Sequence, residues 1–400
     1  MPLLMAGLLA FGLSLHAAEV EGPAPAEIVL GMSTVLSGPS AMLGRDMRTG
    51  VLAGFERANR AGGVNGRKLR LIALDDGYEP SRTAPNMRQL IEQDRVLAII
   101  GNVGTPTAIV AVPIAIEQKT LFFGACSGAG VLRNQPADRY VINYRASYAE
   151  ELGAMVDGLL DGAGLKPEEI AFFTQRDGYG DAGFYSGIQA LKRRGLTDEK
   201  AVLHVRYDRN TLAVENAVAS LVLARTPPRA IVMVGAYAPS GRFIRQCLDA
   251  GLRPLFIGVS FVGGVPLAQD LGRTDATVVV MQVVPSPIDS GLGIVRDYAA
   301  DLRALDTSLV PGFGDLEGYI SARIFIAALE KIKGEPTREG IVDALEGLGR
   351  FDLGVGAPLG LGAEEHQACH RIWPTILRDG AFVPFQWAVL AKPAGRNIQP

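Results

Sequence analysis

The sequence predicts an α/β protein made of two doubly wound parallel-sheet lobes. At 400 residues the chain exceeds one ordinary core and fits two lobes of roughly 150 to 200 residues each. Short β-rich runs alternate with amphipathic helices from residue 28 onward, and the alternation restarts near residue 170. The chain also contains 48 glycines, which suit tight turns between strands and helices.

The first series of elements has the order expected of a parallel sheet. In the helix expected over residues 45–60, Met47, Val51 and Phe55 repeat on one face, and the glycine-rich turn 61–66 ends it. A βαβαβαβ order closes as a parallel sheet with helices on both faces. The elements expected here are strands at 28–32, 68–74, 96–100 and 120–123, and helices at 45–60, 82–94 and 108–117.

The second series repeats this order without a sequence repeat. Its elements are strands at 170–174, 202–207, 230–234 and 254–257, and helices at 183–194, 212–223 and 241–250. Helices at 291–305 and 315–331 follow, with closing strands at 372–377 and 382–389. Candidate crossings between the lobes are residues 144–148, 282–287 and 351–362. We therefore expect a first lobe of residues 27–146 and 285–350, and a second lobe of residues 147–284 and 351–400.

The N-terminus is predicted to be a signal peptide covering residues 1–18. Residues 3–15 form an apolar run too short to span a bilayer, and Ala17 and Ala18 offer a cleavage point. No Lys or Arg precedes this run, and a buried N-terminal helix is the alternative. Later stretches are too short or too polar for a membrane span, so we expect a soluble mature protein.

Composition argues against several classes of protein. The apolar fraction of 48% and charged fraction of 20% describe a globular protein, and the net charge of −3 without a basic block disfavours nucleic acid as a partner. The three cysteines, Cys126, Cys247 and Cys369, are scattered, so they form no metal-ligand spacing and allow at most one disulfide. We expect each to be a small buried hydrophobic residue.

Short motifs follow one another in a characteristic order along the chain. They are Ser37–Pro39, Gly44, Gly62–Gly66, Asp75–Asp76, Ile99–Gly101, Tyr179–Gly180, Gly235 with Tyr237, Arg245–Gln246, Gly251–Leu252 and Phe256–Gly258. From residue 27 to about residue 384 the chain resembles the branched-chain amino-acid-binding receptors. Those receptors are type I periplasmic binding proteins that serve ABC importers.

This resemblance implies two lobes joined by three hinge strands, with a ligand held in the cleft between them. The location agrees with the rule that open parallel sheets bind ligands outside the carboxyl ends of their strands. Closure over the ligand would bury it and shift the population toward the closed state. The resemblance further implies a periplasmic location, a partner permease in the inner membrane, a monomer, and neither cofactor nor catalysis.

The same resemblance assigns ligand contacts to loops of both lobes. In the first lobe, Thr105 aligns with a hydroxyl donor and lies in the loop that begins at Asn102. Thr105 is alternatively an ordinary helix N-cap. Ser127 is the second candidate in this lobe. The neighbouring Gly128 stands where the amino-acid receptors usually carry Thr, so one hydroxyl is missing.

The second lobe is expected to contribute Tyr179, Tyr237, Ser260 and Phe261. The amino-acid receptors place a Glu after the strand that ends at Gly258, where this chain has Ser260. Burying a ligand ammonium without a counter-charge costs several kcal/mol. We therefore expect a ligand other than a zwitterionic amino acid: an amide, a monocarboxylate such as an aromatic acid, or an apolar sterol-like or hopanoid-like lipid. A branched-chain amino-acid receptor and a ligand sensor of the same fold remain alternatives.

Three further patterns are weaker. Residues 178–183 match G-x-G-x-x-G, but the first glycine lies beyond the strand end, so a dinucleotide-dependent enzyme is disfavoured. His366 and His370 are four residues apart, which can indicate a metal site, yet we expect surface residues in a loop. Cys126 with Ser127 suggests a nucleophile, but the predicted cleft loops offer no positioned base. Accordingly, the sequence predicts no metal site and no enzyme.

Overall fold

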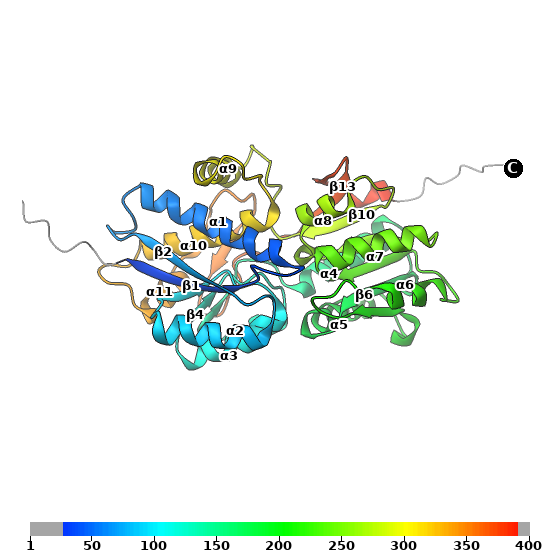
Figure 1. The fold of residues 1–400 in the computed structure, drawn as a ribbon, viewed down its shortest axis with the longest axis horizontal. Helices are drawn as coiled ribbons and strands as arrows, with labels where there is room; N and C mark the ends of the chain where they lie inside the picture. The colour runs from blue at the N-terminus through cyan, green and yellow to red at the C-terminus, as the bar shows by residue number, and fades with distance from the viewer. Residues whose placement is uncertain (1–26, 391–400) are drawn as a thin grey trace, which may run out of the picture.

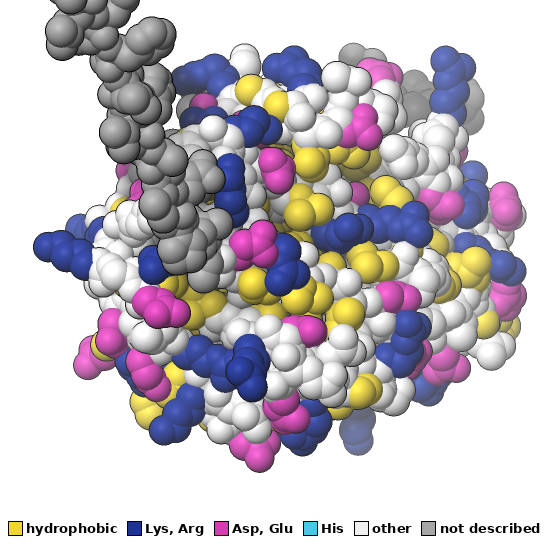
Figure 2. All heavy atoms as spheres, turned by 60° about the vertical axis from the view of Figure 1, so that its left-hand side comes forward, with side chains coloured by type: hydrophobic (Ala, Val, Ile, Leu, Met, Phe, Trp, Pro, Cys, Tyr) yellow, Lys and Arg dark blue, Asp and Glu magenta, His cyan; other side chains and the backbone are white. Residues whose placement is uncertain are grey.

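The computed structural model describes residues 27–390, and the predicted signal peptide lies outside this range. Figure 1 shows two α/β lobes that lie side by side along the longest axis, as the sequence predicts. Among the described residues, no helix is both long and apolar enough to cross a membrane. Positively and negatively charged side chains are interspersed across the face drawn in Figure 2, with apolar side chains between them.

The first lobe is built on a five-stranded parallel sheet in the order β2-β1-β3-β4-β5. In Figure 1, α1 lies on one side of this sheet, and α2 and α3 lie on the other. Its strands are β1 (Ile28–Thr34), β2 (Leu69–Asp75), β3 (Ala98–Ile100), β4 (Leu121–Phe123) and β5 (Val141–Ile142). Its helices are α1 (Ala41–Arg60), α2 (Pro80–Arg88), α3 (Thr105–Glu117), α9 (Gly293–Leu305), α10 (Phe313–Leu329) and α11 (Arg338–Glu346).

Glycines allow α1 and α10 to approach closely. A Cβ atom on Gly50 of α1 would lie 1.8 Å from the carbonyl oxygen of Asp315, and one on Gly318 of α10 would lie 2.3 Å from that of Met47. Both distances are far below van der Waals contact, so these two positions require glycine. This packing joins α10, which is distant in sequence, to the first lobe, and Glu317 of α10 lines the cavity between the lobes.

The second lobe is built on a seven-stranded sheet in the order β14-β13-β10-β9-β8-β6-β7. The central strands are parallel, whereas β13 and β14 run antiparallel at one edge. Its strands are β6 (Ile170–Gln175), β7 (His204–Tyr207), β8 (Ala230–Val234), β9 (Leu255–Gly258), β10 (Val278–Gln282), β13 (Trp373–Arg378) and β14 (Ala381–Pro384). Its helices are α4 (Tyr148–Asp157), α5 (Gly178–Arg193), α6 (Glu215–Val222), α7 (Tyr237–Asp249) and α8 (Gly264–Leu271).

Three chain segments connect the lobes. Residues 143–147 follow β5, and residues 283–292 follow β10. β11 (Gly349–Phe351) and β12 (Leu359–Leu361) form a two-stranded antiparallel hairpin, and residues 362–372 then lead to the second sheet at Trp373. Asn143 of the first connection pairs with Gln367 of the third, so two connections lie side by side.

Several elements of the structure were not predicted from the sequence. β5 has two residues and β10 directly precedes a proline-rich segment, so neither stands out as a strand. Helices α4, α8 and α11 are also absent from the expected elements. Helix α7 begins at Tyr237, four residues before the expected start at residue 241, because Pro239 is compatible with the first turn of a helix. All three cysteines are buried and unpaired, as expected.

Candidate functional site

The candidate site lies between the lobes, where loops after the parallel strands of both sheets meet. Thr105 and Ser127 come from the first lobe, and both are buried. Their hydroxyl oxygens lie 2.8 Å apart. Thr105 is the first residue of α3, and it follows Gly104, whose φ of +105° lets the chain turn into the helix. This arrangement places two hydroxyl groups together at the N-terminus of a helix.

Asn102 and Gly128 both make close contacts within the protein. The side-chain oxygen of Asn102 accepts a hydrogen bond from the backbone N–H of Ser33 at 3.1 Å, so it fixes the loop after β3 to β1. A Cβ atom on Gly128 would lie 2.6 Å from the backbone nitrogen of Tyr148. The absence of a side chain at Gly128 therefore allows the start of α4 to pack closely against this loop.

Aromatic side chains fill the centre of the region between the lobes. The ring of Tyr179 lies 4.7 Å from that of Phe261 and 5.6 Å from that of Tyr148, between centroids. The ring of Tyr78, from the first lobe, lies 5.9 Å from that of Phe261, and its hydroxyl oxygen accepts a hydrogen bond from the side-chain amide of Gln175 at 3.3 Å. All four rings are buried. We call Tyr78, Tyr148, Tyr179 and Phe261 the aromatic cluster.

Tyr78 has an unusual backbone for a bulky residue. Its φ is +64°, in the left-handed region that costs about 1–2 kcal/mol for residues other than glycine. The backbone N–H of Tyr78 donates to the carboxylate of Asp76 at 2.9 Å, which holds the turn. This turn directs the ring between Gly104 and Phe261. An aromatic residue two positions after the Asp75–Asp76 pair, close to the end of β2, is the feature that could have identified it.

Tyr237 lies at the rim of the region between the lobes. It is half-buried at the start of α7, and its hydroxyl oxygen accepts a hydrogen bond from the backbone N–H of Met42 at 3.4 Å. Because Met42 belongs to α1 of the first lobe, Tyr237 contacts both lobes. It does not join the aromatic cluster.

Ser260 donates hydrogen bonds to the buried carboxylate of Glu151. Its backbone N–H donates to Glu151 at 2.7 Å, and its hydroxyl donates to the same carboxylate at 3.0 Å. The guanidinium of Arg145 also donates to the Ser260 hydroxyl oxygen. The sequence offers no acidic residue near Ser260, but α4 brings Glu151 to this position. The expectation that this position lacks a carboxylate is therefore wrong.

Arg145, Glu151 and Glu317 form a buried charged cluster beside the aromatic residues. Arg145 lies 3.3 Å from a carboxylate oxygen of Glu151 and 3.5 Å from one of Glu317. The side-chain exposures are 1%, 0% and 7% respectively. None of the three was predicted from the sequence. The Ser147–Glu150 capping box, which marks the start of α4, is the pattern that could have located Glu151.

The environment shifts the pKa values of this charged cluster. Burial raises the pKa of Glu151 to about 7, although Arg145 and the hydrogen bonds from Ser260 oppose the rise. Burial also raises the pKa of Glu317, again against the attraction of Arg145. Burial disfavours the charged form of Arg145, but the carboxylates of Glu317 and Glu151 outweigh this effect and raise its pKa. Arg145 is therefore positively charged at neutral pH.

Polar contacts hold the lobes together at the edge of the site. Arg209 of the second lobe lies 2.8 Å from the carboxylate of Glu79 in the first lobe. Asn210 donates to the carboxylate of Glu79 at 2.6 Å and to the carbonyl oxygen of Gly77 at 3.0 Å. The lobes are thus closed on one another, and a cavity of about 30 Å³ remains beside Cys126, Ser260, Phe261 and Glu317. That volume is about the size of one water molecule.

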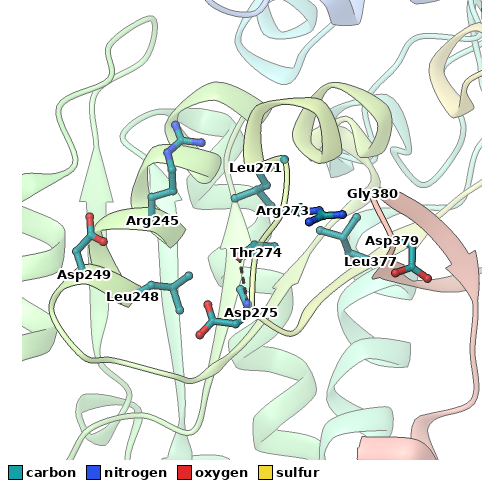
Figure 3. Close-up of a pocket in the computed structure, with 12 residues that line it drawn as sticks. Arg245, Leu248, Asp249, Leu271, Arg273, Thr274, Asp275, Leu377, Asp379 and Gly380 are labelled. Atoms are coloured by element: carbon teal, nitrogen blue, oxygen red, sulfur yellow. Dashed lines mark hydrogen bonds between the residues drawn. The ribbon is translucent and has the colours of Figure 1, made fainter.

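A larger hollow lies elsewhere on the second lobe. Its volume is about 960 Å³, and Arg245, Asp249, Thr274 and Asp275 line it (Figure 3). Residues 274–276 lie just before β10, which begins at Val278, so this hollow lies at the amino ends of the parallel strands. Ligands of parallel sheets bind at the opposite ends of the strands. We therefore place the candidate site at the aromatic cluster.

The weaker sequence patterns have structural explanations. A Cβ atom on Gly180 would lie 1.8 Å from the carbonyl oxygen of Gln175, so this glycine serves the packing of α5 on β6. His366 is buried, with Nδ1 2.9 Å from the carbonyl oxygen of Val141 and Nε2 3.2 Å from Glu346. The expectation of a surface residue is wrong for His366, because this side chain anchors the third connection to the first lobe. Burial raises the pKa of Cys126, which disfavours a thiolate.

The chain resembles solute-binding proteins over most of its length. It is 26% identical over 332 residues to Leu/Ile/Val-binding protein homolog 7 of Brucella abortus, covering 78% of this chain and 79% of the relative. It is 48% identical to a possible leucine/isoleucine/valine-binding protein from Rhodopirellula baltica, whose crystal structure superposes with a TM-score of 0.89. That match covers 92% of this chain and 99% of the other.

A more distant structure shares the fold. The solute-binding protein of an R. palustris ABC transporter, solved in complex with benzoate, has a TM-score of 0.77 at 18% identity. It covers 90% of this chain and 96% of its own.

The family model described as periplasmic binding protein matches residues 27–381. Its members bind small molecules and work with ABC transporters, and their fold is that of receptors. The residues that carry the aromatic cluster and the charged cluster all fall within this match. This chain belongs to the periplasmic binding protein family.

Proposed function

We propose that this protein is the exported, monomeric receptor of an ABC importer and that its lobes close over a small monocarboxylate or apolar ligand. The aromatic cluster beside the Thr105–Ser127 hydroxyl pair is the observation that carries this proposal. Rings from both lobes supply apolar walls, and the hydroxyls at the N-terminus of α3 suit a carboxylate. An aromatic acid combines both features in one molecule.

Both carboxylates of the charged cluster already have partners within the protein. Arg145 already pairs with Glu151 and Glu317, and Glu151 also accepts two hydrogen bonds from Ser260. A ligand ammonium would have to compete with Arg145 for these carboxylates. Burying an unpaired ammonium costs several kcal/mol. The benzoate found in the R. palustris relative is in keeping with this ligand class.

Calorimetric titration with matched ligands tests the ligand class. Isovalerate has the carbon skeleton and the carboxylate of valine but lacks the ammonium, and benzoate adds an aromatic ring. We expect benzoate and isovalerate to bind and valine, leucine and isoleucine to bind at least tenfold more weakly, which corresponds to about 1.4 kcal/mol. Tighter binding of the amino acids than of the acids would contradict the proposal.

A branched-chain amino-acid receptor is the second candidate, and Glu151 favours it. Its carboxylate lies at Ser260, on the second-lobe side of the site, and could face a ligand ammonium. In that case valine would bind tightly, and Glu151→Gln would weaken valine binding while leaving isovalerate binding unchanged. The two candidates therefore differ in both the preferred ligand and the effect of this substitution.

Two further alternatives have their own tests. A sensor of the same fold would bind the same ligand but would fail to stimulate uptake through a reconstituted permease. A dinucleotide-dependent enzyme would be stabilised by nucleotides in a thermal-shift screen, where a saturating ligand contributes a few kcal/mol. We expect stabilisation by the acids and no turnover of them.

A further inference from the structure

The charged cluster contains more negative than positive charge. Two carboxylates, Glu151 and Glu317, face one guanidinium, that of Arg145. With all three groups ionised, the cluster would hold one uncompensated negative charge in a buried site. Such a charge is costly to bury, so it must be balanced by another cation or by a proton.

Among the described residues, no neighbouring cation forms a second direct ion pair with these carboxylates. Arg133 is near enough to lower the pKa of Glu317, and Glu150 is a further anion near Arg133. The Arg133 guanidinium donates to the carbonyl oxygens of Ser127, Ala129 and Arg145 and to the side chain of Gln367. The remaining titratable neighbours are neutral or acidic. They include the Cys126 thiol at 3.2 Å from Arg145, the hydroxyls of Tyr144, Tyr148 and Tyr179, and Asp46 of α1 on the wall of the adjoining cavity.

We propose that Glu151 binds a proton from solvent when the lobes close over an anionic ligand, and that this residue thereby selects acids over amino acids. The proposal rests on the monocarboxylate receptor proposed above and adds the residue and the charge balance that determine its specificity. The carboxylate of a ligand at the Thr105–Ser127 pair would add a second negative charge nearby. Proton binding by Glu151 leaves Arg145 paired with Glu317 and cancels the added charge.

The position of Glu151 makes it the carboxyl group that we expect to bind the proton. It is fully buried, it belongs to the second lobe, and it lies within hydrogen-bond distance of Ser260 in the cleft. Burial raises the pKa of Glu151 to about 7, which places its titration near neutral pH. A nearby anion raises a carboxyl pKa further, whereas a nearby ammonium lowers it. An acid should therefore bind with proton uptake and an amino acid with proton release.

Calorimetry in buffers of different ionisation enthalpy measures this proton directly. We expect benzoate at pH 8 to take up close to one proton per site and at pH 5.5 close to none. The affinity for benzoate should fall by up to about tenfold per pH unit above the pKa of free Glu151. Glu151→Gln should abolish both the uptake and the pH dependence. Glu150→Gln is the matched control, because it removes a carboxyl from the same helical turn and keeps a side chain that can cap α4.

A titration without ligand keeps the proton site testable if the variant folds poorly. In ¹³C-labelled ligand-free protein, we expect one glutamate carboxyl to titrate near pH 7 and its resonance to be missing in Glu151→Gln. Titration of every glutamate below about pH 5 would overturn the proposal, as would benzoate binding with no proton exchange or with proton release. If neither benzoate nor isovalerate binds, the monocarboxylate function itself is wrong, whatever the carboxyl titration shows.

Discussion

The carboxylate of Glu79 lies 2.8 Å from the guanidinium of Arg209, and these two residues belong to different lobes. The same guanidinium lies 3.0 Å from Asp177, which caps the N-terminus of α5 within the second lobe. Arg209 therefore bridges a fixed group of its own lobe and a group of the opposite lobe. An opening movement has to separate Arg209 and Asn210 from Glu79, so these contacts favour the closed form.

The bridge predicts that Arg209→Ala shifts the protein toward the open form. The side chains of Arg209 and Glu79 are 23% and 38% exposed, so solvent screens the ion pair and we expect an effect of about 0.5–1 kcal/mol. That corresponds to a two- to fivefold loss of ligand affinity, with a larger radius of gyration of the ligand-free protein in X-ray scattering.

Arg176→Ala is the control for this prediction. Arg176 pairs with Asp208 at 2.9 Å inside the second lobe, so its removal leaves the contacts between the lobes intact. Equal effects of the two substitutions on affinity and radius would show that the bridge does not influence closure.

The position of the Tyr78 ring depends on Gly104. A Cβ atom at Gly104 would lie 2.2 Å from the ring, and the φ of this residue is +105°. We expect Gly104→Ala to destabilise the protein by about 2–4 kcal/mol, because backbone strain and overpacking add. Ligand affinity should also fall, since the ring of Tyr78 has to leave the aromatic cluster. Chemical denaturation and calorimetry measure the two effects.

Gly66→Ala is the matched control, because Gly66 also has a positive φ, +81°, but a Cβ atom added there would have no neighbouring atom within 4 Å. It should cost only about 1–2 kcal/mol and leave affinity unchanged. A loss of stability for Gly104→Ala no larger than this would contradict the predicted clash.

The buried carboxyl of Asp315 predicts a fall in stability with rising pH. Burial, and then the neighbouring carboxylate of Asp46, raise the pKa of Asp315 to about 8, whereas an unfolded Asp titrates near pH 3.9. The folded protein therefore holds a proton that the unfolded chain releases between these values. The resulting stability is complete below about pH 4 and is lost as the pH rises toward 8, by up to about 1.4 kcal/mol per pH unit.

Asp315→Asn should reduce this dependence, because an amide cannot ionise. Asp46, whose pKa burial raises to about 7, should account for the slope that remains. Urea denaturation of the wild type and the variant at pH 5, 6.5 and 8 gives the slopes. Asp275→Asn in the second lobe is the control, since its side chain is 70% exposed. Parallel slopes for the wild type and Asp315→Asn would exclude a proton bound at this site.

The order and type of most elements could be predicted from the sequence. A continuous apolar run of strand length, such as residues 230–234, indicates a buried parallel strand even before its neighbours in the sheet are known. The glycine turn after α1 likewise ends that helix through local geometry. Thr105, Ser127, Tyr179 and Phe261 were predicted from the resemblance to the branched-chain amino-acid-binding receptors, and each follows a strand end, where parallel sheets bind their ligands.

Other features depended on contacts between distant segments. The two-residue β5 is a strand only because it pairs with β4, and β10 is confirmed as one by its partners β9 and β13. Glu151 and Glu317 are ordinary helix residues in the sequence, and only the packing of α4 and α10 around Arg145 brings both carboxylates to one guanidinium. Local periodicity therefore determined the two α/β lobes, whereas the charge balance between them was decided by the tertiary structure, because burial and proximity set a carboxyl's pKa.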